Sequence, residues 1–547
     1  MGTSRAGKFL SRCNRALIWL VRDFDLLNLL LRALSFALEA LAFGALFFLG
    51  VVARPAGLDD ERRGRLRHVG AMFALALAIS QAVLVATTSA ELMGSTGMGV
   101  RELATASFFI AGCVFAAAAL AMWMALRQPL RLWPAVCAAV VALGASVSLS
   151  HAASRMEDRV ALLLLTAAHH LGMAAWVGGL LFLLLALRSE PEPPFAQAMA
   201  RRFSAMAVAA VVVLVGAGAG LSVFYAGSWR GMWGTSYGIL LSAKIVLTAM
   251  MVALGAANYL AIRGAAETGF LRRLRRFGEV ELGLAFTVLI VAASLTAQTP
   301  SVDEMPENTL TAQSVVQRME WRRPSFHTPE FAQLTPTTPL SVAVREATFT
   351  GGSKSDAQDR AWSEYNHHWA GLMVLAAGLL ALLTMLPRGR WARHWPLLFL
   401  GLAVFIVVRA DPECWPLGPR PFWASFTAPD VLEHRAFALL IGAFAIFEWG
   451  VRTGRLRWRP AQFVFPALCA VGGALLLTHT HALGEGTDEV FAELSHTPMG
   501  VLGATAGWAR WLELRLDDDE SGAQRVAAWV WPVCLALVGL LLLNYRE

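Results

Sequence analysis

Residues 203–225, FSAMAVAAVVVLVGAGAGLSVFY, run from Phe203 to Tyr225 without one charged side chain. A helix needs about 20 mainly apolar residues to cross the hydrocarbon core of a bilayer, so this segment predicts a transmembrane helix. The composition agrees with that prediction: of the 547 residues, 56% are hydrophobic and 16% are charged, whereas soluble proteins carry roughly 25% charged residues. We therefore expect an integral membrane protein.

Similar apolar runs recur along the chain and predict an all-α, polytopic membrane helix bundle of about 14 transmembrane helices in two halves, eight and then six. The shortest are 395–410 and 497–513. The expected spans are 33–53, 68–90, 104–126, 132–151, 160–187, 203–225, 237–262, 279–298, 368–386, 395–410, 431–450, 462–479, 497–513 and 526–543. The corresponding domains are an N-terminal tail with an interfacial helix (1–32), a first membrane domain (33–298), a periplasmic loop segment (299–366) and a C-terminal membrane domain (367–547).

Arginines predict how the helices are oriented. They cluster in the loops 54–67, 263–276, 388–393 and 452–459, which strict alternation places on one side of the membrane. Basic short loops are cytoplasmic, so both termini are expected to be periplasmic, although the basic N-terminal tail departs from this rule. Because the net charge of +7 resides largely in these loops, it indicates membrane orientation and gives no reason to expect a nucleic-acid partner.

Histidines gather on the opposite, outer face when the chain is threaded in this way. Histidine is rare in spanning helices without a functional reason, and imidazole is the commonest metal ligand. The pattern therefore predicts a protein that meets a metal ion or a metal cofactor at this face. The nine histidines at or just inside the face are His151, His169, His170, His367, His368, His434, His479, His481 and His496.

The motif AAHHLGMAAWVGGL, at 167–180, carries the buried members of this group. His169 and His170 fall about ten residues inside their span, and Met173 follows one helical turn later. A borderline imidazole next to a soft thioether suits Cu(I) better than Mg²⁺ or Ca²⁺. The alternative is structural, with the histidines hydrogen-bonded inside the bundle and the methionine filling space.

Three charged side chains also lie inside predicted spans: Glu39, Lys244 and Glu281. A charge at the bilayer centre costs about 2.5–3.5 kcal/mol or more, so such groups face the bundle interior and find partners. Glu39 and Lys244 lie toward the outer ends of their helices and could pair with each other. Glu281 lies near the cytoplasmic end, where extension to the interface is an alternative. Structural pairing and a part in an ion path remain equally open for all three.

The second half places histidine at the outer ends of four helices, in SEYNHHWAGL, EHRAF, LLLTHTHALG and ELSHTPMG. Four helices that present imidazoles at one depth can complete a three- or four-nitrogen metal site. Interfacial histidines that only cap helix ends are the alternative. The six residues are His367, His368, His434, His479, His481 and His496.

Four stretches of the first half resemble the copper resistance protein D (CopD) family: 169–180, 201–225, WGTSYGILLSAKIVLTAMMVALGAANYLAIR at 233–263, and RRFGEVELGLAFTVLIVAASLTAQTP at 275–300. The resemblance covers residues 160–298 well. The C-terminal half resembles an extension found on some bacterial members. The resemblance places the following residues at characteristic family positions: His169, Trp176, Gly179, Tyr237, Gly238, Lys244, Asn258 and Glu281.

The resemblance implies copper handling in the inner membrane, typically uptake toward the cytoplasm beside a periplasmic CopC-like copper-binding partner. We therefore expect a copper transport or tolerance protein, and no enzyme, that captures copper through His and Met and passes it inward. The sequence contains no P-loop, so any transport would not be driven by ATP at such a site. Two other functions stay open: a membrane haem b-type or electron-transfer protein with paired histidine ligands, and a copper sensor or assembly factor.

Overall fold

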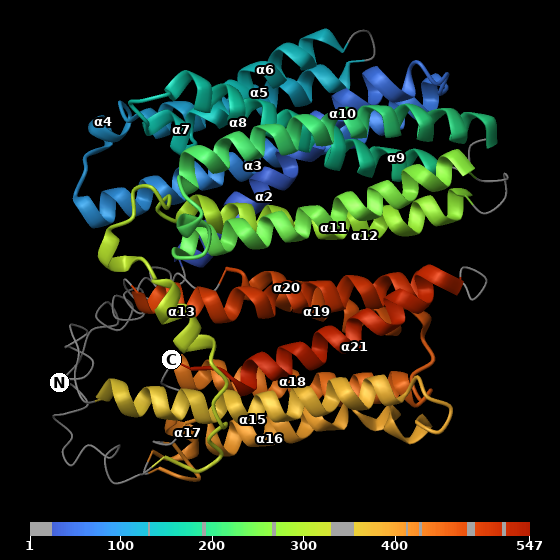
Figure 1. Cartoon of the computed structure of the whole chain (residues 1–547). Helices are drawn as coiled ribbons and strands as arrows, with labels where there is room; N and C mark the ends of the chain where they lie inside the picture. Colours follow the sequence, from blue (N-terminus) through green and yellow to red (C-terminus); the bar gives the residue numbers. More distant parts are fainter. Residues whose placement is uncertain are drawn as a thin grey trace, which may run out of the picture. The chain divides into compact units, whose positions relative to one another are not determined.

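The computed structural model describes residues 24–128, 132–188, 193–264, 270–329, 355–411, 414–418, 420–425, 429–478, 487–516 and 521–546. Every extended regular element within these ranges is a helix (Figure 1), so the predicted all-α fold is confirmed. The chain divides into two compact units, one up to Asn308 together with 477–482, and one made of Thr309–Leu476 and Leu483–Glu547. The boundary falls inside the polar segment 299–366.

The first unit contains α2 (Phe24–Phe47), η1 (Phe48–Ala53), α3 (Asp60–Thr96), α4 (Val100–Leu103), α5 (Ser107–Arg127), α6 (Trp133–Ser148), α7 (His151–Ser154), α8 (Arg159–Met173), η2 (Ala174–Gly178), α9 (Gly179–Arg188), α10 (Pro193–Ala226), η3 (Arg230–Met232), α11 (Ser236–Gly264), α12 (Phe270–Ala297) and η4 (Pro306–Asn308). The second unit contains α13 (Ala312–Met319), α15 (Ser355–Leu383), η6 (Arg390–His394), α16 (Leu397–Arg409), α17 (Phe422–Ser425), α18 (Pro429–Arg452), η7 (Arg459–Phe463), α19 (Val464–Leu476), α20 (Thr487–Arg515) and α21 (Ser521–Leu543).

Twelve helices of the described ranges are long and apolar enough to cross a membrane, where the sequence predicts about 14. Two predicted spans account for the difference. The span at 132–151 corresponds to α6, which has 16 residues and is short for a crossing. The span at 497–513 lies inside α20, which is long enough but carries buried polar side chains, including Glu493 at 0% exposure. Because these groups face neighbouring helices, low hydropathy here reflects a polar interior surface.

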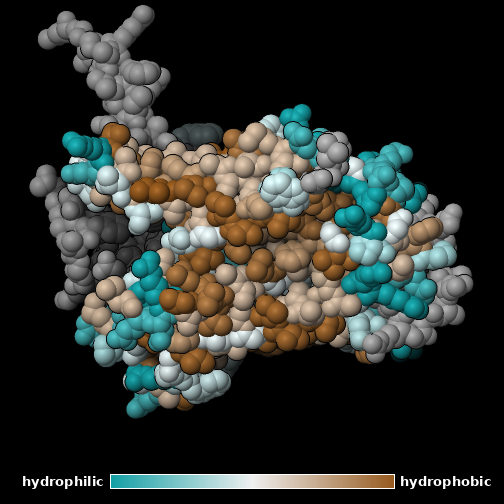
Figure 2. Space-filling model, turned by 90° about the horizontal axis from the view of Figure 1, so that it is seen from above, coloured by the Kyte–Doolittle hydropathy of each residue, from teal (hydrophilic) through white to brown (hydrophobic). Residues whose placement is uncertain are grey.

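The outer surface of the spans is apolar. Figure 2 shows a face on which hydrophobic residues occupy the middle and hydrophilic residues the two ends. On α10, Val212 and Val223 are 67% and 73% exposed. Large apolar side chains exposed in this way are expected where helices meet lipid instead of water. The structure is therefore that of a multi-pass membrane protein.

α2 lies at the centre of the first unit and packs against α3, η2 and α12. It is one continuous helix from Phe24, so residues 24–32 extend the first span and do not form a separate interfacial helix. The rest of the predicted interfacial helix, 14–23, lies outside the described residues. Central placement matters because α2 carries Glu39, which is 1% exposed.

The helix that carries the His–His motif contains a π-helical segment. α8, η2 and α9 form one span, Arg159–Arg188, in which η2 has the wider π geometry. A Cβ atom added to Gly178 would lie 2.0 Å from the carbonyl oxygen of Ala40, and one added to Gly44 would lie 2.4 Å from the Cα of Gly178. The glycines therefore let η2 and α2 approach backbone to backbone, as small residues do in membrane bundles. π-Helical segments occur frequently at functional sites.

In the second unit, α15 and α20 pack against α21, α19 against α20, and α16 against α18. Its core contains Trp395, Phe465 and Trp531, all buried. Arg452 lies over all three rings, with its guanidinium carbon 5.0–5.7 Å from their centroids. An arginine inside an apolar core is stabilised by such aromatic faces.

Candidate functional site

Three helices of the first unit meet at the carboxylate of Glu39. His170 on α8 donates from Nδ1 to Oε1 of Glu39 over 3.0 Å, and the hydroxyl of Ser146 on α6 donates to Oε2 over 2.9 Å. Phe36 packs edge-on against the imidazole, with the ring centroids 6.1 Å apart. When Nδ1 carries the proton, the neutral ring keeps its lone pair on Nε2. A carboxylate that orients a histidine in this way is the usual outer partner of a metal-bound imidazole.

His169 faces a different side of α8. Its Nδ1 donates to the backbone oxygen of Leu214 on α10 over 3.1 Å, and its ring lies against Gly218, where an added Cβ would come within 3.3 Å of it. The side chain of Lys244 interacts electrostatically with the imidazole. The two adjacent histidines therefore differ in surroundings, because His170 has an acid beside it and His169 has a cation nearby.

Met173 is the last residue of α8, one turn after His170, and is partly buried. The π segment follows it at once, and within that segment Trp176 donates from its indole nitrogen to Oε1 of Glu281 over 2.7 Å. Glu281 is 3% exposed. The span Arg159–Arg188 thus contacts one buried acid before the π segment and another acid within it.

The surroundings of Glu281 include a second polar group on α11. A Cβ added to Gly255 would lie 3.3 Å from Oε1 of Glu281, so Gly255 leaves room for the carboxylate. One turn further along α11, Asn258 is 6% exposed, and its side-chain oxygen is buried without a hydrogen-bond partner among the described residues. The resemblance named Asn258, but spacing alone offered no reason to associate it with Glu281.

The structure does not show two of the arrangements that the sequence left open for these charges. Glu39 does not pair with Lys244, since its oxygens accept from His170 and Ser146. These partners are 131 and 107 positions away, a separation from which no sequence pattern predicts contact. Glu281 does not extend to the membrane surface, because its carboxylate is buried against Trp176.

In the second unit, Tyr545 connects two predicted histidines. Its ring stacks on His367 of α15, with centroids 3.9 Å apart and planes 23° apart, and meets His496 of α20 edge-on at 5.6 Å. Nδ1 of His367 donates to the oxygen of Ser363 over 2.8 Å, and Nδ1 of His496 lies 2.9 Å from the oxygen of Ala492. Both histidines therefore hold Nδ1 in a local backbone contact, and in His367, whose Nδ1 donates, the lone pair lies on Nε2.

His368 has a different arrangement from its neighbour. Its Nε2 donates to the oxygen of Tyr545 over 3.1 Å, and its Nδ1 accepts from the backbone nitrogen of Ser325 over 3.0 Å. With both ring nitrogens occupied, His368 has no lone pair for a metal. It holds the segment that follows α21 against the segment that follows α13, which is the structural role that the sequence left open as an alternative.

His434, on α18, is close to half exposed and donates from Nδ1 to Oδ1 of Asp411 over 2.6 Å. Asp411 is buried and lies 3.9 Å from a nitrogen of Arg435. His434 therefore repeats the carboxylate–histidine arrangement of the first unit. His479 and His481 lie outside the described residues. Within the described residues, no group of three or more His, Cys, Asp or Glu side chains is close enough to hold a metal ion.

Sequence reasoning missed a buried charged cluster in the second unit. Glu448 is 2% exposed and accepts from Nε of Arg452 over 2.6 Å, while Arg510 and Glu513 pair at 2.6 Å. Glu448, Arg452 and Arg510 each have one buried polar atom without a hydrogen-bond partner among the described residues. Arg452 had been counted with the basic loop 452–459, but it belongs to α18. The signal was available, because FEWGVR (447–452) places two charges one turn apart at the end of an apolar run.

Comparison with known proteins places part of this chain in a family. Residues 197–295 match the family described as CopD, Copper resistance protein D, which is a narrower range than the 160–298 expected from the resemblance. Over 158 residues, 28% are identical to the Copper transport protein CutJ of Bacillus subtilis (strain 168), an overlap that spans 28% of this chain and 28% of that protein. No solved structure matches. The region matched by the CopD family model covers most of α10, all of α11 and most of α12, so the similarity to this family lies in three neighbouring helices of the first unit.

Proposed function

We propose that this chain binds copper inside the membrane and passes it from the periplasmic face toward the cytoplasm. The CopD match and the similarity to a protein named for copper transport support copper as the ion. The role is transport or tolerance and not catalysis. The copper would enter from the periplasm of a bacterial inner membrane, delivered there by a CopC-like copper-binding protein.

The pairing of His170 with Glu39 is the observation that carries this proposal. An imidazole whose Nδ1 is held by a buried carboxylate offers Nε2 as a basic and well-oriented ligand. A cation bound at Nε2 would also be stabilised by the acid, because charges interact strongly in a medium of low dielectric. Among the intramembrane histidines, His170 therefore has the better surroundings for a metal ion.

Met173 is the proposed second ligand. It lies three positions after His170, and side chains at that spacing share a helix face. A thioether with one imidazole suits Cu(I), and a site with few ligands can release its ion. We assign His169 a supporting role, because Lys244 would oppose a cation beside it.

Glu281 is proposed as the next residue to bind the copper ion on its way toward the cytoplasm. It contacts Trp176, which lies six residues beyond His170 or about 9 Å along the helix axis. The π segment begins directly after Met173, so the helix geometry changes between the part of the span that contacts Glu39 and the part that contacts Glu281. The positive charge of Lys244, near His169, would repel a copper ion on the side of α8 that faces α10.

The histidines of the second unit are proposed as a capture site at the outer face. His367, His434 and His496 are proposed ligands there, and each holds Nδ1 in a hydrogen bond or a close backbone contact. His479 and His481 remain proposed members of this site. His368 is not proposed as a ligand, since both its nitrogens are engaged.

Metal analysis of the purified protein tests the proposal. We expect copper to co-purify or to bind after addition of Cu(I) under reducing conditions, and we expect His170→Gln to lose the copper bound at the intramembrane site while the capture site of the second unit keeps its own. The matched control is His169→Gln, the same change at the adjacent position. An absorption spectrum recorded on the same sample separates the haem alternative, because a Soret band without copper would overturn the proposal. Uptake of radioactive copper into oriented vesicles then tests direction.

A further inference from the structure

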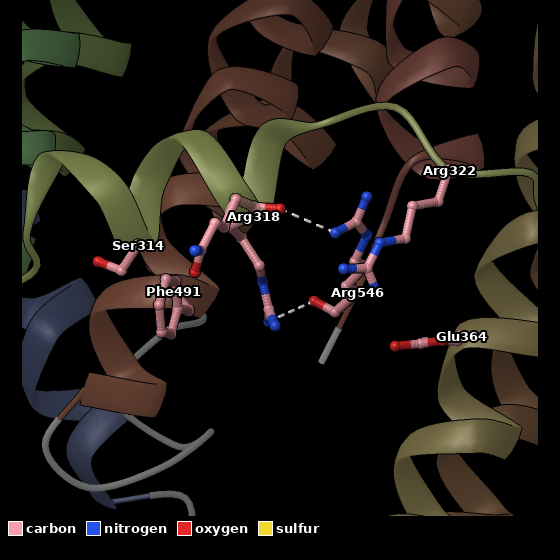
Figure 3. A pocket seen from close by; sticks show the side chains of 7 residues that line it. Ser314, Arg318, Arg322, Glu364, Phe491 and Arg546 are labelled. Carbon is pink, nitrogen blue, oxygen red and sulfur yellow. Dashed lines mark hydrogen bonds between the residues drawn. The ribbon is translucent and has the colours of Figure 1, made fainter.

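A pocket of about 340 Å³ opens at one end of the second unit (Figure 3). It is lined by side chains of α13 and the residues just after it, by α15 and α20, and by the segment that follows α21. Glu364 lies one turn before His367 and His368 on α15, so the pocket adjoins the outer histidines without including one. Nothing in the proposed copper path uses these residues.

The lining is rich in arginine. Arg318, Arg322 and Arg546 contribute three guanidinium groups, and Glu364 is the one acid among the seven lining residues. In Figure 3 the guanidinium groups of Arg322 and Arg546 lie next to each other, and the two charges repel. Like charges held together at a cavity favour an anion between them.

Two of the three arginines are held in place by the fold. Arg546 donates from one terminal nitrogen to the oxygen of Gln317 over 3.0 Å and from the other to the oxygen of Glu320. Arg318 donates to the oxygen of Arg546 and lies over the ring of Phe491, 4.7 Å from its centroid. Each guanidinium has five N–H donors, so both keep donors for a ligand and need little reorganisation to bind one.

Nearby acids leave the pocket positive. Glu320 and Asp488 act on the arginines from outside the lining, but Asp488 is 3.7 Å from Arg360 and is shared with it. Burial lowers the pKa of Arg318 and Arg546 lowers it further, while Tyr545, Glu364 and Asp488 raise it. Three arginines against Glu364 leave two positive charges in the lining.

We propose that this pocket binds a phosphate group. A free phosphate dianion balances both positive charges and the phosphodiester of a lipid headgroup balances one, and in either case the oxygens match the planar fork of arginine, which binds phosphate through two parallel hydrogen bonds. The apolar ring of Phe491 forms one wall of the pocket. The ligand is therefore either a phosphate attached to a larger molecule, whose apolar part contacts this ring, or a free phosphate ion. The phosphate comes either from the headgroup of an anionic phospholipid or from a soluble phosphate. This inference does not rest on copper transport.

Binding to the full-length protein in nanodiscs tests the inference. One arm uses phosphatidylcholine discs and titrates inorganic phosphate by calorimetry. The other arm uses discs that contain phosphatidylglycerol and counts retained lipids by native mass spectrometry. The test variant is Arg322→Gln, whose side chain is exposed. The matched control is Arg323→Gln, which makes the same charge change at an exposed neighbour outside the pocket.

We expect Arg322→Gln to weaken binding of the effective probe at least ten-fold and Arg323→Gln to change it less than two-fold. Glu364→Gln removes the one acid and should strengthen binding about three-fold. Phosphate binding in pure phosphatidylcholine discs identifies a soluble ligand, whereas retention of phosphatidylglycerol alone identifies a headgroup. If neither probe binds the unmodified protein, or if both arginine variants lose binding equally, the inference is overturned.

Discussion

The imidazole of His170 donates to the buried carboxylate of Glu39 over 3.0 Å, although 131 positions separate the two residues in the chain. This pair joins α8 to α2 inside the membrane. The sequence could only place this histidine in a span. In the structure, the hydrogen bond puts the proton on Nδ1 and leaves a free lone pair at Nε2. Within the first unit, the proposed copper path starts from this pair.

Removal of the acid should weaken copper binding without removal of a ligand. In Glu39→Gln the amide still accepts a hydrogen bond, but the negative charge is lost. Loss of such a partner typically lowers metal affinity about 10- to 100-fold. Competition titration with a Cu(I) chelator measures the change. Ser146→Ala, which removes the hydroxyl on the other carboxylate oxygen, should have a smaller effect; an equal effect would argue that packing, and not charge, supports the site.

Close approach of α2 to the π segment makes Gly178 sensitive to one added methyl group. In Gly178→Ala the new Cβ would lie 2.0 Å from the oxygen of Ala40, so the helices must separate, at a cost of about 1–3 kcal/mol. Thermal unfolding followed by tryptophan fluorescence should show a lower Tm. Gly216→Ala is the control, because its Cβ meets nothing within 4 Å. A Gly178→Ala variant as stable as this control would contradict the packing described.

The charged pair Glu448–Arg452 should contribute strongly to the stability of the second unit when one partner is removed. Glu448→Gln leaves Arg452 without its acid in a buried site, and disruption of a buried pair costs about 3–5 kcal/mol. Chemical unfolding in detergent measures the loss. Arg65→Gln breaks the exposed pair with Glu61 at 2.7 Å and should cost at most about 1 kcal/mol. Similar losses in the two variants would refute the distinction.

Stability should depend on the protonation of His151, which lies on α7 between spans. Burial is the largest effect and lowers its pKa; Arg32 and Arg155 lower it further, while Asp303 and the hydrogen bond to the oxygen of Thr296 raise it. Because the ring titrates near pH 6.5 in the unfolded chain, a proton binds His151 more tightly in the unfolded chain than in the folded protein. The contribution of the neutral His151 ring to the free energy of unfolding is therefore fully present above about pH 6.5 and is lost as the pH decreases through the lowered pKa.

Thermal unfolding at pH 8, 7, 6 and 5 checks this dependence. The Tm of the unmodified protein should approach that of His151→Gln as the pH decreases. A gap that stays constant or widens toward pH 5 would show that the folded protein does not hold this ring neutral.

Much of the fold could be predicted from the sequence, because charge-free runs such as 203–225 specify transmembrane helices directly. α20 shows the limit: Glu493 and Thr497 make it polar, and only its position between α19 and α21 explains how they are buried. The histidine motif was visible, but its separation into His170 beside an acid and His169 beside a cation depends on helices that meet in space. The role of His368 likewise depends on Tyr545, 177 positions away.

Copper affinity of His170→Gln, compared with His169→Gln, tests the central claim most directly. Both variants make the same change on adjacent residues of one helix, so effects on insertion and folding are matched. The account predicts that His170→Gln loses the Cu(I) bound inside the first membrane domain, whereas His169→Gln retains its affinity within a few-fold. Loss at position 169 with retention at position 170, or full binding in both variants, would contradict it.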